Sequence, residues 1–106
     1  MVKRGEIWLA ALDPTVGSEI QKTRPCVIVS PAEINQYLKT VIVAPMTTGN
    51  KPAPFRIPVM FQQKSGLILL DQLRTLDKTR LVKHIGMVTD TTLTATLTGL
   101  QEVFAE

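Results

Sequence analysis

The chain has 106 residues, a length that predicts one domain over residues 1–106. Because 12 residues are lysine or arginine and 9 are aspartate or glutamate, its formal net charge is +3. A charged fraction of 20% beside an apolar fraction of 44% excludes a disordered chain, and no apolar run is long enough for a membrane span. Cys26 is the only cysteine, which excludes an internal disulfide and a thiolate-rich zinc site and leads us to expect a cytoplasmic protein.

Short apolar runs separated by Gly, Pro, Asn and Asp dominate the chain. They predict strands over residues 6–12, 25–30, 40–46, 55–61 and 66–70, with a later one near 82–88. Their number and spacing predict a mainly β fold, a small barrel. Residues 48–54 are expected to form a loop because glycine, proline, asparagine and threonine fill that segment.

Two segments have helical patterns. Ser30 as N-cap and Pro31 in the first turn predict a short helix over residues 31–35. After Asp90, a second expected N-cap, four apolar side chains recur at helical spacing: Leu93, Leu97, Leu100 and Phe104. The threonines in this segment are poor helix formers, so packing of the apolar stripe against the barrel must hold the C-terminal helix.

The first two expected strands are apolar on both faces. In the first, for example, Trp8 and Ala10 alternate with Ile7 and Leu9. A barrel interior covers one face, and a single C-terminal helix is little cover for the other. The sequence therefore predicts a homodimer.

The chain lacks the residues that several kinds of catalytic site require. His84 is the only histidine, so one subunit has no pair of imidazoles for acid–base catalysis. There is no His/Asp/Glu cluster with metal-ligand spacing, no phosphate-binding glycine loop and no nucleophile elbow. We expect neither a metal nor a cofactor, and we interpret His84 as a strand residue whose ring is hydrogen-bonded.

Polar residues gather at three places between the apolar runs. Arg24 ends a long loop and is held extended by Pro25, either for function or as a solvated surface arginine. Thr47 and Thr48 follow the third strand, where they can donate to a phosphate or, as their position favours, cap a turn.

The third polar place is Asp71-Gln72, directly after the apolar residues 67–70. A carboxylate there can be partly desolvated, which would raise its pKa towards that of a general base, or it can be satisfied by backbone N–H groups or by Arg74. Three further basic residues in or near loops can follow a nucleic-acid backbone or only add solubility: Lys22, Lys51 and Arg56.

Five segments together resemble the MazF/PemK family of toxin endoribonucleases, in family order and with family-like spacing. They are residues 4–8, 13–19, 23–30, 43–48 and 70–77. The resemblance implies an SH3-like barrel with an amphipathic C-terminal helix, working as a homodimer. It also implies sequence-selective cleavage of single-stranded RNA and inhibition by a cognate antitoxin whose acidic tail occupies the RNA groove.

The resemblance also implies roles for individual residues. Arg24 falls on the family's catalytic arginine and Thr47 on its catalytic threonine, while Glu19 and Asp71 match acidic positions that handle substrate, Asp71 as the base in some members. The other substrate-binding or base candidates are Ser18, Lys22, Thr48 and Gln72. Some members have histidine in place of Ser18 and arginine in place of Leu69, so the triad built on those residues does not carry over.

The mechanism expected from these residues needs no metal-bound water, because the RNA 2′-hydroxyl is the nucleophile. Arg24 and Thr47 stabilise charge on the phosphorus, and Glu19 or Asp71 is the base. The expected products carry 2′,3′-cyclic phosphate and 5′-hydroxyl ends. The main alternative is a non-catalytic gyrase poison of the same fold; a peptide-binding SH3-like module is disfavoured because only five aromatic residues, Trp8, Tyr37 and three phenylalanines, are present.

Overall fold

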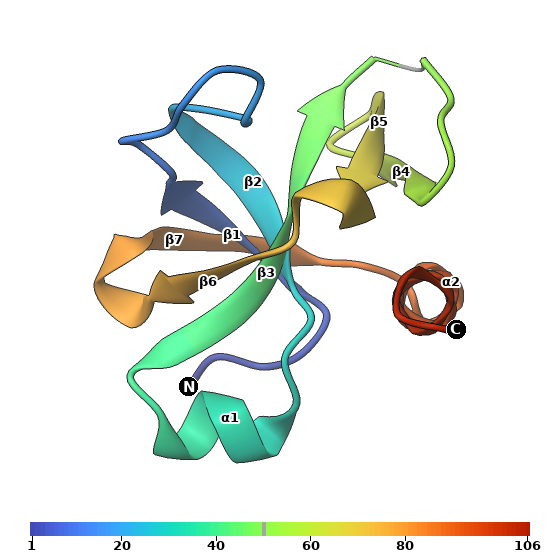
Figure 1. Ribbon diagram of the computed structural model, residues 1–106. Coiled ribbons are helices and arrows are strands. Elements are labelled where there is room, and N and C mark those ends of the chain that lie inside the picture. The colour runs from blue at the N-terminus through green and yellow to red at the C-terminus, as the bar shows by residue number, and fades with distance from the viewer. Residues whose placement is uncertain (50) are drawn as a thin grey trace.

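The computed structural model is built around seven antiparallel strands and describes residues 1–49 and 51–106 (Figure 1). The strands are β1 (Glu6–Ala11), β2 (Thr23–Ile28), β3 (Thr40–Thr48), β4 (Arg56–Phe61), β5 (Lys64–Leu69), β6 (Arg74–Asp77) and β7 (Leu81–Met87). Their order in the sheet is β4-β5-β3-β2-β1-β7, and β6 pairs with the free edge of the first half of β3. Asn50, within the loop expected over residues 48–54, lies outside the described residues.

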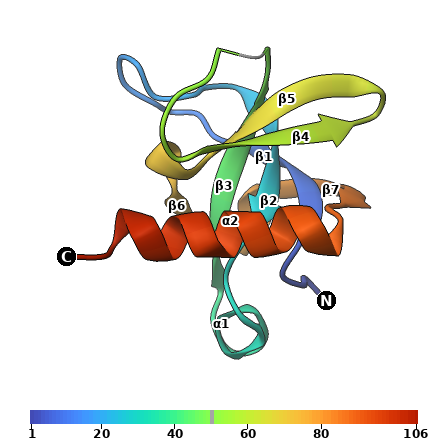
Figure 2. The ribbon, with the colours of Figure 1, turned by 90° about the vertical axis from the view of Figure 1, so that its right-hand side faces the viewer.

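Two α-helices and two single turns of 3-10 helix complete the fold. They are α1 (Ala32–Tyr37), η1 (Leu70–Gln72), η2 (Lys78–Arg80) and α2 (Asp90–Val103). The C-terminal helix α2 lies across one face of the sheet below β4 and β5, and α1 lies at the end of the molecule remote from the β1–β2 loop (Figures 1 and 2). Among the described helices, none is long and apolar enough to cross a membrane.

Both expected N-caps are wrong by one residue. Pro31, not Ser30, is the N-cap of α1, and its ring has no acceptor for a side-chain cap; the buried Ser30 hydroxyl donates to Asn35 Oδ1 at 2.5 Å. At α2 the N-cap is Thr89, whose hydroxyl accepts from the backbone N–H of Thr92 at 3.2 Å. Asp90 is then the first helical residue, where a negative charge still favours the helix N-terminus.

The strand bounds differ from the expected ones where the functional residues lie. β2 begins at Thr23, which pairs with Ala11, so Arg24 lies within a strand instead of at the end of a loop. β3 continues to Thr48, so Thr47 and Thr48 are strand residues. β6 was not predicted, because its four residues have only one buried apolar side chain, Leu76.

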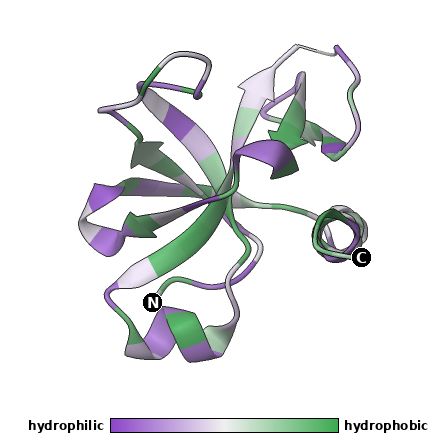
Figure 3. Cartoon of the chain, in the orientation of Figure 1, coloured by the Kyte–Doolittle hydropathy of each residue, from purple (hydrophilic) through white to green (hydrophobic). Residues whose placement is uncertain are grey.

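The long strand β3 divides the apolar residues into two clusters. Its first half pairs with β2 and β6 and its second half with β5, so the sheet bends strongly along it (Figure 1). The first cluster lies under α2, β4 and β5, and the second lies between the first half of β3, β1, β2 and β6. Most of β3 is hydrophobic, and only its two ends are not (Figure 3).

The residues of β2 and of the segment after it alternate between these clusters. Val27 and Val29 belong to the first cluster, while Cys26 and Ile28 belong to the second. Both apolar faces of this segment are therefore covered within the chain, and a second subunit is not needed to bury them.

The two ends of the sheet approach each other through side chains. Among the described residues no hydrogen-bonded pairing joins β4 to β7. A Cβ atom built on Gly86 of β7 would lie only 2.7 Å from the ring of Phe61 on β4, so the phenylalanine packs directly on the glycine. The expected mainly β, barrel-like fold with a C-terminal helix is confirmed, with a sheet that is curved but not closed by hydrogen bonds.

Candidate active site

Arg24 and Thr47 lie at matching ends of two neighbouring strands. The ladder between β2 and β3 pairs Cys26 with Pro45 and Ile28 with Val43. Arg24 and Thr47 each lie two residues beyond the last pair of this ladder. Both residues line one pocket of about 180 Å³, whose walls also include Met46, Thr48, Val59 and Phe61.

The Arg24 guanidinium is held by the loop that precedes it. Arg24 is half-buried, and its Nε donates to the carbonyl of Gln21 at 3.1 Å. Its two terminal nitrogens have no hydrogen-bond partner among the described residues, and the Thr47 hydroxyl donates only to the carbonyl of Thr48 at 3.3 Å. The pocket thus holds a fixed cation with N–H groups available to an anion, beside a neutral hydroxyl donor.

Four other candidates share a second, larger pocket. Ser18, Glu19, Asp71 and Gln72 line a depression of about 540 Å³ together with Ile20, Arg74 and two apolar neighbours. Glu19 is exposed, and its Oε1 accepts from the backbone N–H of Val16 at 2.6 Å. The sequence-predicted residues therefore separate into a pocket with the arginine and the hydroxyls and a pocket with the carboxylates.

Lys22 lines neither of these two pockets. Its side chain is exposed, its φ of 70° is in the left-handed region, and its carbonyl accepts from the backbone N–H of Leu12 at 3.0 Å. This contact closes the base of the β1–β2 loop, so Lys22 has a structural role at its backbone.

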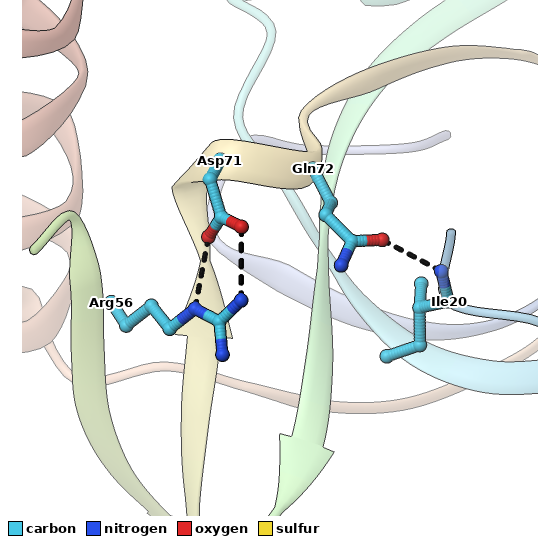
Figure 4. A network of polar contacts seen from close by, with 4 residues as sticks. All are labelled: Ile20, Arg56, Asp71 and Gln72. Atoms are coloured by element: carbon cyan, nitrogen blue, oxygen red, sulfur yellow. Dashed lines mark hydrogen bonds and ion pairs between the residues drawn. The ribbon is translucent and has the colours of Figure 1, made fainter. Parts of the chain in front are cut away.

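Asp71 is not the desolvated carboxylate that its position after a buried strand suggested. It is exposed on η1 and forms a two-pronged ion pair with Arg56 of β4, with Nε to Oδ1 at 3.1 Å and Nη2 to Oδ2 at 3.0 Å (Figure 4). Arg74, one of the partners considered for Asp71 from the sequence, instead donates to the carbonyl of Leu12 at 2.9 Å. The side-chain hydrogen bond to Asp71 raises the pKa of Arg56 above its ordinary value.

Replacing Asp71 by asparagine is expected to change stability little. The side chains of Arg56 and Asp71 are 28% and 40% exposed, and such exposed pairs contribute about 0.2–1 kcal/mol. Urea unfolding should therefore give a free energy of unfolding lowered by less than about 1 kcal/mol. A larger loss would mean that the ion pair holds η1 in place, and Asp71→Asn would then be unsuitable for kinetic comparison.

Cys26 is excluded as a nucleophile by its surroundings. The thiol is fully buried in the second cluster, and burial raises its pKa to about 12 despite the nearby positive charge of Arg74. At pH 8 we expect the Cys26 thiol of the folded protein not to react with a thiol-specific reagent over minutes. The unfolded protein should react at once with one equivalent of the reagent per chain. Rapid reaction of the folded protein would show that the second cluster opens.

His84 is hydrogen-bonded on its strand, as expected. Its Nε2 lies 2.9 Å from the carbonyl of Gly86 and 3.6 Å from the buried carboxylate of Glu6, and its ring stacks on Trp8 with centroids 5.3 Å apart. Among the described residues, no group of three or more His, Cys, Asp or Glu side chains is arranged to hold a metal ion.

Sequence reasoning missed the contribution of the β4–β5 hairpin to the arginine pocket. Gln62, Lys64 and Ser65 line that pocket with Arg24 and Thr47. Gln62 and Gln63 both have positive φ and form the tight turn of the hairpin. The sequence carries no signal for this, because the hairpin reaches the pocket only through the pairing of β5 with the end of β3.

Comparisons with known proteins agree with this architecture. Residues 3–104 match the family described as PemK-like, MazF-like toxin of type II toxin–antitoxin system. The chain is 37% identical to Endoribonuclease PemK of Escherichia coli, over 96% of this chain and 81% of that protein. Two solved structures have the same fold. MazF from Deinococcus radiodurans has a TM-score of 0.85 and 24% identity over 96% of this chain and 94% of that chain. A mycobacterial endoribonuclease in complex with its cognate antitoxin has a TM-score of 0.81 and 23% identity over 96% of this chain and 93% of that chain.

A family match over nearly the whole chain and a relative above 30% identity lead to one conclusion. The chain belongs to the PemK-like, MazF-like toxin family of type II toxin–antitoxin systems.

Proposed function

We propose that this toxin is a metal-independent endoribonuclease that cleaves single-stranded messenger RNA. The observation that carries the proposal is the Arg24–Thr47 pair, a half-buried guanidinium with two terminal nitrogens available beside a hydroxyl in one pocket. The name of the Escherichia coli relative, an endoribonuclease, supports the same reaction.

In the proposed reaction the RNA supplies its own nucleophile. The 2′-oxygen forms a bond to the adjacent phosphorus while the bond from phosphorus to the 5′-oxygen breaks, which leaves a 2′,3′-cyclic phosphate and a 5′-hydroxyl. The proton of the 2′-hydroxyl goes to a carboxylate, and the departing oxygen takes up a proton. Arg24 and Thr47 donate hydrogen bonds to the phosphoryl oxygens, whose negative charge grows in the transition state.

The two carboxylates of the second pocket differ in readiness to accept that proton. Both oxygens of Asp71 are bound by Arg56, whereas Glu19 Oε2 has no partner among the described residues. We therefore assign the base to Glu19, with Asp71 holding Arg56. Glu19→Gln should lower kcat at least tenfold more than Asp71→Asn does, and the reverse order would give the base role to Asp71.

We further propose a cytoplasmic homodimer that is inhibited by a cognate antitoxin with an acidic tail. Large apolar side chains at 41% exposure or more support a second subunit. They lie on β4 and β7, directly before β4 and directly after α2: Phe55, Met60, Val82, Met87 and Phe104. Light scattering at micromolar concentration should give twice the chain mass of 11.7 kDa. The net charge of +3 favours an acidic inhibitor. The mycobacterial structure of the same fold was solved in complex with its cognate antitoxin.

The experiment that tests the function is incubation of the purified protein with a long single-stranded RNA in EDTA, followed by analysis of the ends. Discrete cuts with 2′,3′-cyclic phosphate and 5′-hydroxyl ends are expected. Ends carrying 5′-phosphate would contradict the mechanism. Intact RNA with a folded dimer would favour the gyrase poison, which a supercoiling assay then tests.

A further inference from the structure

We infer that Gln72 is a positioning residue, which holds the β1–β2 loop and thereby the Glu19 carboxylate in place. The inference rests on the proposed function and assigns Gln72 a role other than binding substrate or accepting a proton. Its Oε1 accepts a hydrogen bond at 2.6 Å from the backbone N–H of Ile20, which is 52 residues away along the chain (Figure 4).

The β1–β2 loop, residues 12–22, is fastened at its base by other contacts. The Leu12 backbone N–H donates to the Lys22 carbonyl, Arg74 donates to the Leu12 carbonyl, and Arg80 donates to the Asp13 carbonyl at 2.7 Å. These contacts close the loop but do not reach its tip. They would remain if Gln72 were replaced.

The tip of the loop makes its hydrogen bonds locally. Among the described residues, residues 14 to 19 make hydrogen bonds only within the loop. The Thr15 hydroxyl donates to the Asp13 carboxylate, the Val16 N–H donates to the Glu19 carboxylate, and the Glu19 N–H donates to the Val16 carbonyl. The next two residues are the ones held from outside: Ile20 by Gln72 and Gln21 by Arg24. Glu19 therefore sits directly before the two attachment points of the loop.

The chemistry of the contact identifies the atom that matters. A backbone N–H can only donate, so the Gln72 amide presents its oxygen to Ile20, and the amide nitrogen has no partner among the described residues. The neighbouring Asp71 side chain reaches in another direction, to Arg56 (Figure 4). The turn η1 thus joins β4 to the β1–β2 loop through two consecutive side chains, and both the loop and η1 line the carboxylate pocket.

Two substitutions separate positioning from substrate binding. Gln72→Met keeps the length of the side chain but removes the acceptor, so the Ile20 N–H loses its partner. Gln72→Glu keeps an acceptor oxygen but removes the amide nitrogen and adds a negative charge. If Gln72 acts through its oxygen on Ile20, the methionine variant loses the function and the glutamate variant retains it.

The first readout is amide hydrogen exchange of the RNA-free protein, followed by NMR. Losing one hydrogen bond should speed exchange at Ile20 about tenfold in Gln72→Met, and Gln72→Glu should restore protection. The Leu12 amide, bonded at the loop base, is the internal control and should not change. Equal exchange at Ile20 in wild type and Gln72→Met, or no restoration by glutamate, overturns the inference.

The second readout is the separation of kcat from KM. Gln72→Met is expected to lower kcat about tenfold with little change in KM, because the carboxylate is misplaced after RNA has bound. Gln72→Glu should keep kcat and raise KM, since the added charge repels RNA. Unchanged kcat in Gln72→Met overturns the positioning role. A wild-type protein that cuts no RNA overturns the proposed function, while the exchange data still decide whether Gln72 holds the loop.

Discussion

Replacing Arg24 by alanine is expected to lower kcat about 10²–10³-fold while the protein remains folded. The guanidinium lies on β2, is held by the Gln21 carbonyl and contributes no buried ion pair among the described residues, so its loss removes charge stabilisation without opening the core. Cleavage of a defined oligonucleotide under single-turnover conditions measures the loss in the chemical step. Arg24→Lys should recover only part of the rate, because an ammonium cannot donate two parallel hydrogen bonds.

A matched control removes a cation far from the pocket. Lys39 is exposed next to the first residue of β3, at the end of the molecule where α1 lies, whereas Thr47 is near the other end of that strand. Lys39→Ala should cleave within about twofold of wild type, as surface substitutions away from special features change little. Equal losses in Lys39→Ala and Arg24→Ala would mean that overall charge, and not a fixed guanidinium, drives the reaction.

Gly66→Ala is expected to disable the site by moving Thr47. A Cβ atom at Gly66 would lie 2.4 Å from the carbonyl oxygen of Thr47 and 3.4 Å from its carbonyl carbon. These are backbone atoms of a paired strand and cannot move aside as a flexible side chain can. We expect a loss of about 1–3 kcal/mol in the free energy of unfolding and a fall in kcat of at least tenfold.

Gly99→Ala is the control, because Gly99 is also closely packed but lies on α2 and does not line the Arg24–Thr47 pocket. A Cβ there would meet the end of the Leu70 side chain at 2.6 Å, and that side chain can shift. Alanine also favours the helix by about 1 kcal/mol over glycine, so α2 should tolerate it. The free energy of unfolding in urea and kcat are measured for both variants. A Gly66→Ala protein with wild-type kcat would show that the position of Thr47 is unimportant.

The sequence predicted the elements whose signals are local. Apolar runs gave six of the seven strands, and the Leu93 to Phe104 stripe gave α2, because burial imposes these patterns directly. β6 was not predicted because it is short, combines polar with apolar residues and pairs only with the edge of β3. The N-cap of α1 was misplaced by one residue because the Ser30 hydroxyl accepts from the Ile42 N–H of β3, and that of α2 because Thr89 instead of Asp90 accepts from the Thr92 N–H.

The candidate site was predictable as a set of residues but not as an arrangement. Arg24 and Thr47 are recognisable from their segments, whereas their placement side by side depends on the β2–β3 register. Arg74, three residues away, was one possible partner of Asp71 in the sequence, and the structure pairs Asp71 with Arg56 on another strand. Contacts between residues distant along the chain, such as Gln72 to Ile20, leave no local pattern in composition or spacing.

The bend of the sheet along β3 makes catalysis inseparable from correct folding. This one strand pairs with β2, β5 and β6 and carries Thr47 next to the buried Met46. A slip of its register by one residue would turn the Thr47 hydroxyl towards the opposite face of the sheet. β5, which pairs Leu67 with Thr47, also follows β3 in the chain, so a nascent polypeptide cannot fix Thr47 until β5 has been made. The pocket that holds Thr47 can therefore form only after more than half of the chain has been synthesised.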